Sequence, residues 1–364
     1  MFKPDSFILP SQCFILVGMK STSIAVFIAF LLFSVNLKAQ TPDKEGSLVN
    51  WMSLEEALQK NETNPRPIIL DFYTDWCGWC KQMMRTTYAN ADLAGYINNN
   101  FYPVKFNAEG KDTIEYLGQK YLPTSAEPRV THPLAIKLLQ GKLMYPTTLF
   151  LNNYDKKKNE FVFSMLAQGY LDNKKLEPVL IYALENVFRN SGYDDFKNQF
   201  DKAFFDTATD TRLKNLKWKN PGEFFGKADS TKKKTLVFVH TDWCNACKVM
   251  GRTSFTDSLT EKYIAEKFEV IDFNPESTET LTFKGQTFSN THTPPIPFHQ
   301  LAVALCRNSL TLPSLVVLDE KESVIDAIPF YLNPQSLKSI AVYYGDNIYK
   351  TKSWNDYMQP VPQK

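Results

Sequence analysis

The sequence lacks a strong imbalance of charge, a long hydrophobic run and the compositional bias of a fibrous or disordered chain. Its 364 residues carry 41 Lys and Arg against 39 Asp and Glu, and the net charge of +2 provides no broad basic surface for a nucleic-acid backbone. Apolar side chains make up 43% of the chain and aromatic ones 14%, which excludes disorder and collagen-like or coiled-coil architectures. The composition is that of a globular protein, and the length favours two domains.

The N-terminal region predicts an export signal. A basic residue after Met19 precedes an apolar run over 24–35, and the small residue Ala39 follows. This order is typical of a secretory signal peptide, from Met19 to Ala39. The apolar run of 12 residues is short for a transmembrane helix, which needs about 20, and an uncleaved anchor is the alternative. Residues 1–18 are interpreted as a spurious upstream extension, and the mature protein is predicted to be periplasmic or secreted.

An internal repeat organises the rest of the sequence. The segment 74–81 recurs as 241–248, an offset of 167 residues. Further positions match at the same offset without a gap: Trp51 with Trp218, Met83 with Met250, His132 with His299, and Pro146 with Pro313. Because such self-similarity marks a duplicated unit, we predict two domains, over 47–205 and 214–364, joined by a linker over 206–213.

Each copy alternates between predicted strands and helices. Apolar runs over 67–73 and 235–240 have the composition of buried central strands, and each leads directly into a Cys-x-x-Cys motif and a helix. The later elements are strands over 101–107 and 146–151 and a helix over 173–189 in the first copy, and strands over 268–274 and 313–318 and a helix from Pro334 in the second. This order predicts two α/β sandwiches on mixed sheets with right-handed crossovers.

The two Cys-x-x-Cys motifs are the candidate reactive sites. The first cysteine of each motif, Cys77 or Cys244, is predicted to cap its helix, where unpaired backbone N–H groups and the positive helix end lower the pKa of a thiol. The resulting thiolate attacks a disulfide and forms a mixed disulfide, which Cys80 or Cys247 then resolves. Electrons move in pairs, so the chemistry requires no cofactor.

These motifs resemble those of a known family. The segment 71–81, with Tyr145-Pro146-Thr147 downstream, resembles the active-site strand, redox motif and cis-proline loop of thioredoxin-fold proteins. In the second copy, the segment 242–248 is similar to the periplasmic C-terminal domain of transmembrane disulfide reductases. The resemblance covers both copies and implies two tandem thioredoxin-like α/β sandwich domains.

The resemblance also implies how a substrate would bind. It predicts cis peptide bonds before Pro146 and Pro313, which would expose the preceding backbone for strand-like pairing with an extended substrate. The alternative is an ordinary trans proline at the start of an edge strand. The implied substrate-binding residues are Trp76, Tyr145 and Pro146 in the first copy, and Trp243, Leu312 and Pro313 in the second.

Both copies depart from a minimal thioredoxin before the proline strand. From Cys77 to Pro146, and from Cys244 to Pro313, the chain runs 69 residues. The long insertions, over 110–135 and 277–302, are candidates for reshaping the substrate groove. They contain His132 and His299, for which a capping or packing role is favoured over a role as acid, base or ligand.

The copies differ six residues before the first motif cysteine. Thioredoxin-like proteins typically carry a buried Asp there; the first copy has Asp71 and the second has Phe238. In such an apolar run, desolvation should raise the pKa of the Asp71 carboxyl, which could then accept a proton from Cys80 while the mixed disulfide resolves. The alternative is that Asp71 only forms hydrogen bonds within the sheet. The second copy would resolve without it, through water or His240.

Other interpretations of the cysteines are less well supported. A zinc site of four thiolates is disfavoured because the motifs occupy equivalent positions in separate domains. Covalent haem attachment needs His after the second cysteine, where Lys81 and Lys248 stand instead. Purely structural disulfides remain a competitor, since they are common outside the cytosol. Cys306 has no counterpart in the first copy and is predicted to be a buried thiol.

The predicted function is that of a protein thiol–disulfide oxidoreductase whose catalytic residues are Cys77, Cys80, Cys244, Cys247 and Asp71. No metal or cofactor is predicted. Its partners would be protein thiols and disulfides, with a membrane disulfide reductase as candidate electron donor, and the direction of electron flow is open. Two alternatives remain: a non-catalytic module that binds peptides in the thioredoxin grooves, and an electron relay dedicated to one client.

Overall fold

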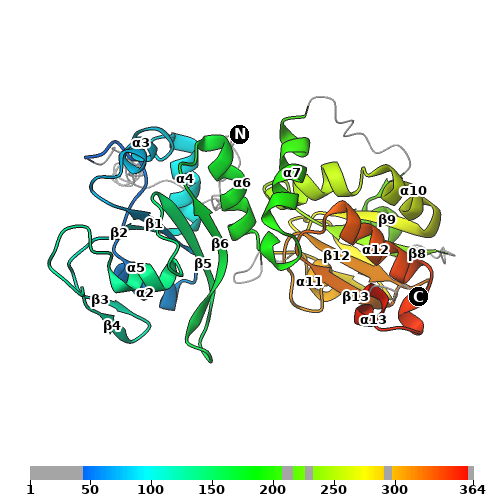
Figure 1. Cartoon of the computed structure of the whole chain (residues 1–364). Helices are drawn as coiled ribbons and strands as arrows, with labels where there is room; N and C mark the ends of the chain where they lie inside the picture. The colour runs from blue at the N-terminus through cyan, green and yellow to red at the C-terminus, as the bar shows by residue number, and fades with distance from the viewer. Residues whose placement is uncertain (1–43, 207–215, 226–232, 291–296, 360–364) are drawn as a thin grey trace, which may run out of the picture. The chain divides into compact units, whose positions relative to one another are not determined.

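The computed structural model describes residues 44–206, 216–225, 233–290 and 297–359 (Figure 1). The predicted extension over 1–18, the signal peptide over 19–39 and nearly all of the linker over 206–213 lie outside the described residues. Within the described ranges, no helix combines the length and the hydropathy that crossing a membrane requires.

The first copy has a four-stranded sheet with the order β2-β1-β5-β6. Its elements are α2 (Leu54–Thr63), β1 (Ile68–Tyr73), α3 (Gly78–Thr86), α4 (Ala91–Asn100), β2 (Tyr102–Asn107), β3 (Ile114–Tyr116), β4 (Gln119–Tyr121), α5 (Pro133–Leu138), β5 (Thr147–Asp155), β6 (Glu160–Gln168), α6 (Asn173–Leu184), the 3₁₀ turn η3 (Val187–Arg189) and α7 (Tyr193–Phe204). Strands β1 and β2 are parallel. In Figure 1, α3 and α4 lie on one side of this sheet, and α2 and α5 on the other.

The second copy has a five-stranded sheet with the order β13-β12-β8-β9-β7, in which β9, β8, β12 and β13 correspond to β2, β1, β5 and β6 and the short edge strand β7 is added. Its elements are β7 (Trp218–Lys219), α8 (Pro221–Phe224), β8 (Lys234–Val239), α9 (Asn245–Val249), the π-helical turn η4 (Met250–Ser254), α10 (Ser258–Lys267), β9 (Phe268–Phe273), β10 (Leu281–Phe283), β11 (Gln286–Phe288), α11 (Gln300–Leu305), β12 (Ser314–Leu318), β13 (Val324–Pro329), α12 (Pro334–Gly345), η5 (Ile348–Lys350) and α13 (Trp354–Met358). Strand β8 is parallel to β9 and antiparallel to β12, so the sheet is mixed as predicted.

The central strands explain why these sheets form. Five of the six residues of β1 and all six of β8 are buried, as expected for apolar strands covered on both faces. Helix α10 packs against α12 in the second copy (Figure 1). The predicted fold class is therefore confirmed: the chain contains two thioredoxin-like α/β sandwiches.

The chain divides into two compact units whose boundary does not follow the sequence repeat. The first unit comprises residues up to 149 together with 168–173, and the second comprises 150–167 and 174–364. Almost all of α6 and the whole of α7 thus belong to the second unit. This grouping places residues of the closing helix of the first copy in the same unit as the second cysteine pair.

The insertions contain the β3–β4 and β10–β11 hairpins and are anchored by the paired histidines. The Nδ1 atom of His132 accepts a hydrogen bond from the Leu134 N–H (3.2 Å), so the side chain caps α5. Its Nε2 atom lies 3.1 Å from the carbonyl oxygen of Asp112, to which a neutral ring donates. His299 repeats both contacts at α11. Both ring nitrogens are thus engaged, which confirms the capping role.

Candidate functional site

The first cysteine pair lies where β1 leads into α3. The Cys77 N–H donates to the Thr74 carbonyl (3.0 Å) in the turn after the strand, which sets Cys77 at the N-cap of α3. The Cys77 sulfur accepts a hydrogen bond from the Cys80 N–H (3.1 Å) and is joined to the Cys80 sulfur as a disulfide. The predicted helix cap is confirmed.

The second pair repeats this geometry between β8 and α9. Cys244 is the N-cap of α9, and its sulfur accepts from the Cys247 N–H (3.1 Å) and is bonded to the Cys247 sulfur. The helix differs in one respect, because α9 continues as the π-helical turn η4, whereas α3 is α-helical throughout. Both first cysteines are buried in this oxidised form.

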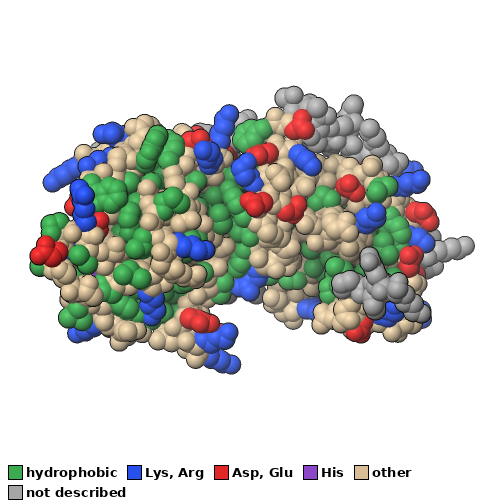
Figure 2. All heavy atoms as spheres, viewed as in Figure 1, with side chains coloured by type: hydrophobic (Ala, Val, Ile, Leu, Met, Phe, Trp, Pro, Cys, Tyr) green, Lys and Arg blue, Asp and Glu red, His purple; other side chains and the backbone are tan. Residues whose placement is uncertain are grey.

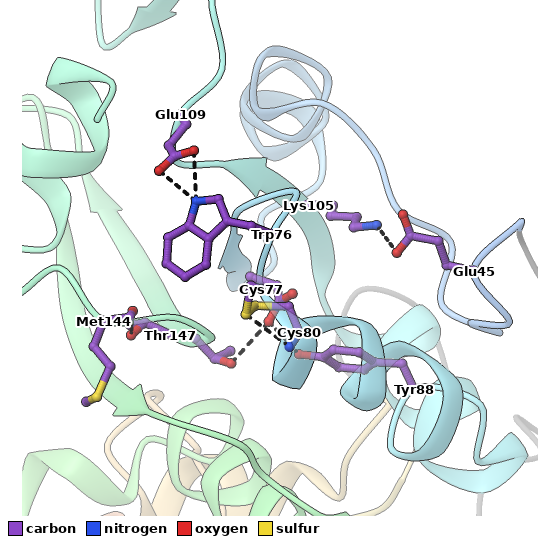
Figure 3. Close-up of a disulfide and its surroundings, with 11 residues drawn as sticks. Glu45, Trp76, Cys77, Cys80, Tyr88, Lys105, Glu109, Met144 and Thr147 are labelled. Carbon is purple, nitrogen blue, oxygen red and sulfur yellow. Dashed lines mark hydrogen bonds and ion pairs between the residues drawn. A yellow bond between two sulfur atoms is a disulfide. The ribbon is translucent and has the colours of Figure 1, made fainter. Parts of the chain in front are cut away.

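A tryptophan stands beside each pair and is held by a glutamate. The Trp76 indole N–H donates to both carboxylate oxygens of Glu109 (3.0 and 3.1 Å), and Figure 3 shows the ring next to the Cys77–Cys80 disulfide. In the second copy, Trp243 donates to Glu276 (3.0 Å) at the same repeat offset. Both indoles are exposed and fixed in orientation. Such a surface can line a substrate path beside the sulfur atoms.

The proline loops have the predicted conformation. The peptide bonds Tyr145-Pro146 and Leu312-Pro313 are cis. In each copy a hydroxyl donates back to the carbonyl of the residue two before the proline: Thr147 to Met144 (2.6 Å) and Ser314 to Thr311 (2.7 Å). Tyr145 also packs edge-on against Trp76 with ring centroids 6.3 Å apart, so the loop and the tryptophan belong to one site.

An apolar rim surrounds the first pair. Trp79 is 64% exposed and packs against the Tyr170 ring (5.5 Å between centroids). These two residues line a shallow pocket together with Gly78 and Gln82. Leu143 and Met144, just before the proline loop, are also exposed. A substrate at this pair would therefore meet exposed hydrophobic side chains.

Asp71 lies beneath this site as a buried carboxyl. It is fully buried on β1, where its Oδ1 atom accepts from the Tyr88 hydroxyl (3.1 Å) and the Thr148 hydroxyl (3.5 Å), while Oδ2 has no hydrogen-bond partner among the described residues. Burial raises the pKa of Asp71 to about 6, and the Tyr88 hydrogen bond and the Lys105 ammonium oppose that rise. In Figure 3, Tyr88 points toward the disulfide, and Lys105 pairs with Glu45. The expected rise in the pKa of Asp71 is confirmed.

The second copy replaces this buried polar group as a set. At the offset of 167 residues, Asp71, Tyr88 and Thr148 correspond to Phe238, Phe255 and Leu315. Phe238 packs against Phe255 (4.9 Å between ring centroids) and pairs in register with Leu315 across the sheet. The second site therefore has an apolar floor.

His240 takes up other contacts in the second copy. Its ring stacks on Phe238 (4.5 Å between centroids), and its Nε2 atom lies 2.6 Å from the Asp272 carboxylate. These contacts place the imidazole at the ends of β8 and β9. His240 is thus held between the Phe238 ring and the Asp272 carboxylate.

One residue at the second pair was not identified from the sequence. Glu185, just after α6, accepts hydrogen bonds from the N–H groups of Ala246 (2.6 Å) and Asn245 (3.1 Å), and its Oε2 atom lies 3.5 Å from the Cys244 sulfur. No motif marks this glutamate. The one sequence signal is that Asp346, which directly follows the closing helix α12 of the second copy as Glu185 follows α6, is also acidic.

Cys306 belongs to neither pair. It is a free buried thiol, and burial raises its pKa to about 11. Among the residues described, no group of three or more His, Cys, Asp and Glu side chains could hold a metal ion.

Two matches with known proteins cover part of the chain. A family model named Thioredox_DsbH and described as a protein of unknown function, DUF255, matches residues 41–176. An uncharacterized protein of Caenorhabditis elegans is 29% identical over 72 residues, and the match covers 20% of this chain and 10% of that protein.

The chain is also similar to several solved structures. A thioredoxin-fold protein from Helicobacter pylori is 16% identical, with 43% of this chain and 89% of that one covered and a TM-score of 0.29. A DsbH oxidoreductase is 18% identical, with 37% and 84% covered and a TM-score of 0.26. The reduced DsbD C-terminal domain from Neisseria meningitidis is 18% identical, with 36% and 93% covered and a TM-score of 0.24.

The observations on the chain itself carry the assignment. Both copies have a cysteine pair at the start of a helix and a cis proline directly before a strand that pairs within the central sheet. The two bonded pairs support a thiol–disulfide redox function in general terms. Both cysteine pairs thus lie in α/β sandwiches of the predicted fold class, and residues 41–176 match the Thioredox_DsbH family model.

Proposed function

We propose that the protein catalyses thiol–disulfide exchange on protein substrates in an exported compartment, through both cysteine pairs. The observation that carries this proposal is the placement of Cys77 and Cys244 at helix N-caps, each with a backbone N–H donating to its sulfur. Such a position favours the thiolate, which is the nucleophile in disulfide exchange. A structural disulfide across one helical turn would add little stability, because it closes a very short loop.

The exchange at the first pair takes two steps. In the reduced protein, the Cys77 thiolate attacks one sulfur of a substrate disulfide, forms a mixed disulfide and releases the other substrate sulfur as a thiol. The Cys80 sulfur then attacks Cys77, releases the second substrate thiol and leaves the Cys77–Cys80 disulfide. Two electrons and two protons pass to the substrate. Asp71 accepts the Cys80 proton in the second step, because its raised pKa suits proton transfer near neutral pH.

The surface around the first pair supports protein substrates. Figure 2 shows hydrophobic surface on the first copy. Most of the exposed large hydrophobic side chains belong to this copy, among them Trp76, Trp79, Leu122, Ile136, Leu143, Met144 and Phe163. Exposed apolar surface of this kind is typical of interaction sites. We infer that the substrates are extended segments with apolar residues near their cysteines, and that Tyr145 pairs with their backbone.

Turnover requires a second redox partner. A protein that reduces substrates accumulates its own disulfides, so a donor of electron pairs must restore the dithiols. A membrane disulfide reductase in the same exported compartment fits this requirement. Export is supported by the pattern of a signal peptide from Met19 to Ala39, in which a basic residue, an apolar run and a small residue follow one another. The reverse flow, from substrate thiols to the protein disulfides, uses the same residues.

The experiment that tests the proposal removes both nucleophiles. The protein should reduce an accessible test disulfide in the presence of a thiol donor, and Cys77→Ser combined with Cys244→Ser should abolish this activity. The matched control is Cys306→Ala, which should keep full activity because Cys306 is a buried free thiol that belongs to neither pair. Unchanged turnover in the double variant would refute the proposal.

A trapping experiment separates an enzyme from a peptide-binding module. Cys80→Ser leaves the attacking thiol but removes the resolving one, so substrates should accumulate on Cys77 as mixed disulfides. These complexes should survive denaturing electrophoresis and disappear on reduction. Complexes that form equally well with Cys77→Ser would instead favour non-covalent binding in the groove.

A further inference from the structure

Glu185 brings a carboxylate to the second cysteine pair. It follows the C-terminal end of α6, and its two oxygens accept the N–H groups of Asn245 and Ala246 at 3.1 and 2.6 Å. Oε2 lies 3.5 Å from the Cys244 sulfur. Glu185 and Cys244 belong to the same compact unit of the chain, over 174–364. The carboxylate therefore contacts the sulfur predicted to be the nucleophile.

Buried aromatic contacts hold Glu185 in this position. Tyr182, three residues earlier, packs against Phe196 of α7 (5.9 Å between centroids) and donates its hydroxyl to the Ser191 carbonyl (2.9 Å). Phe196 in turn packs against Tyr331 (5.2 Å), in the second copy. Both Phe196 and Tyr331 are fully buried. Because these contacts are part of the core, the packing of α6 fixes the place of the Glu185 backbone.

The second copy does not make an equivalent contact with its own closing helix. At the matching place, Asp346 follows α12 and pairs with Lys267 at 3.3 Å. The acidic position is thus present in both copies, but only Glu185 is directed at a cysteine pair among the described residues. This difference argues against a general role in ending the helix.

The carboxyl at the second site serves a different cysteine from Asp71 at the first. Asp71 is assigned to the proton of the resolving Cys80, and the second copy has Phe238, Phe255 and Leu315 in place of Asp71 and its two partners. A thiol must lose its proton before it can attack a disulfide. At the second pair, the carboxylate of Glu185 lies 3.5 Å from the sulfur of the attacking Cys244 and can accept that proton.

We propose that Glu185 is a catalytic residue of the second site, where its carboxylate takes the proton of the Cys244 thiol as the thiolate attacks. This inference rests on the proposed function. The thiolate forms a bond to one substrate sulfur while the substrate disulfide breaks, and Glu185 returns the proton to the departing substrate sulfur. Cys247 then attacks Cys244 and releases the second substrate thiol with the Cys247 proton. The dithiol is oxidised, and the substrate disulfide is reduced to two thiols.

The electrostatic environment agrees with this role. Burial raises the pKa of Glu185 to about 7, and the N–H groups of Ala246 and Asn245 and the Lys248 ammonium on α9 oppose the rise. Besides the N–H groups and the Asn245 side chain, Lys248 of α9 and Cys244 at its N-cap interact with the carboxyl. A base with a pKa near the working pH is partly ionised and can both accept and return a proton.

The test uses the full chain with Cys77 and Cys80 replaced by Ser, so that the measured reactivity comes from the second pair and not from the first. The variant Glu185→Gln keeps one oxygen, which can accept one of the two N–H bonds, but it cannot exchange a proton. The alkylation rate of Cys244 with iodoacetamide, followed by mass spectrometry across pH 5–10, should show two inflections with Glu185, because the thiol and the carboxyl titrate as a pair. It should show one inflection with Glu185→Gln. Identical profiles would overturn the proposal.

Turnover of a test disulfide provides the second measurement. With Glu185→Gln, kcat/KM should fall at least about tenfold at pH 7 and should approach that of the unsubstituted protein by about pH 9, where hydroxide removes the thiol proton directly. A loss of the same size at every pH would indicate a structural contact, and a faster variant would indicate a carboxylate that blocks the site. Either result would overturn the proposal.

Two controls complete the design. Asp346→Asn alters the equivalent acidic position and should change neither profile. If the second pair shows no turnover but the two inflections still collapse to one in Glu185→Gln, proton sharing with Cys244 is upheld and the proposed function of this pair is rejected. The two failures are therefore distinguishable.

Discussion

Replacing Asp71 should make the protein more stable at neutral pH while it impairs the first site. The pKa of the carboxyl is raised from 3.8 to about 6 because the side chain is fully buried. Between these pH values the folded protein holds a proton that the unfolded chain has lost. Stability therefore falls as the pH rises from about 4 to about 6 and then levels off. Ionised Asp71 costs about 3 kcal/mol of unfolding free energy at pH 8, at 1.36 kcal/mol per pH unit.

The measurement compares wild type with Asp71→Asn by urea unfolding between pH 4 and pH 8, with both disulfides intact. Asn preserves the shape and can still accept from the Tyr88 hydroxyl, but it does not titrate. Its buried amide adds a cost that is constant with pH. The advantage of the variant over wild type should therefore grow by about 3 kcal/mol across this range. Parallel curves for the two proteins would refute the reasoning.

Tyr88→Phe is the matched control. The Tyr88 hydroxyl lies 3.1 Å from Asp71 Oδ1, and this hydrogen bond lowers the pKa of the carboxyl. Its removal should move the titration of Asp71 above pH 6 and extend the stability loss to higher pH. In rapid-mixing experiments, Asp71→Asn should also slow the resolution of the Cys77 mixed disulfide more than the initial attack. Equal resolution rates across pH 6–9 would show that Asp71 has no catalytic part.

The other predictions concern residues outside the two reactive pairs. His132→Ala should lower the free energy of unfolding by about 2 kcal/mol, because it removes the cap of α5 and leaves the Asp112 carbonyl without its donor. Turnover should be unchanged. Lost activity at full stability would favour an acid–base role instead. Cys306 should resist iodoacetamide at pH 8 in the folded protein and react once urea unfolds it, because a thiol with a pKa of about 11 is only about 0.1% ionised at that pH. Equal alkylation rates in both states would contradict its burial.

The sequence predicted those features that depend on local pattern. The apolar run over 67–73 gave a buried central strand because only such a run can be covered on both faces of a sheet. The cysteine caps followed from the position of each motif between a strand and a helix. The cis bond before Pro146 was predicted from the resemblance to thioredoxin-fold proteins. For His132 the sequence had left open a capping role and an acid, base or ligand role, and its contacts in the structure show the capping role.

Features that depend on tertiary contacts were beyond the sequence alone. Tyr88 and Thr148 lie 17 and 77 residues from Asp71, and only folding brings their hydroxyls to its carboxyl. A signal for this group was nevertheless present, because all three positions become apolar together at the repeat offset. Glu185 had no such signal, since its contact with Cys244 depends on how the end of α6 packs through Tyr182 and Phe196.

The two sites thus combine a shared cysteine geometry with carboxyls of different origin. At the first pair, Asp71 lies on the strand that precedes Cys77, so strand and site form one local unit. At the second pair, the carboxylate of Glu185 comes from a segment that precedes the predicted linker over 206–213. Since α7 also supplies Phe196 to pack against Tyr331, a fragment that begins at 214 would retain both cysteines but lose its proton acceptor and part of its core. The second pair therefore depends on residues from the first copy of the repeat, which explains why its local motif alone does not contain the whole site.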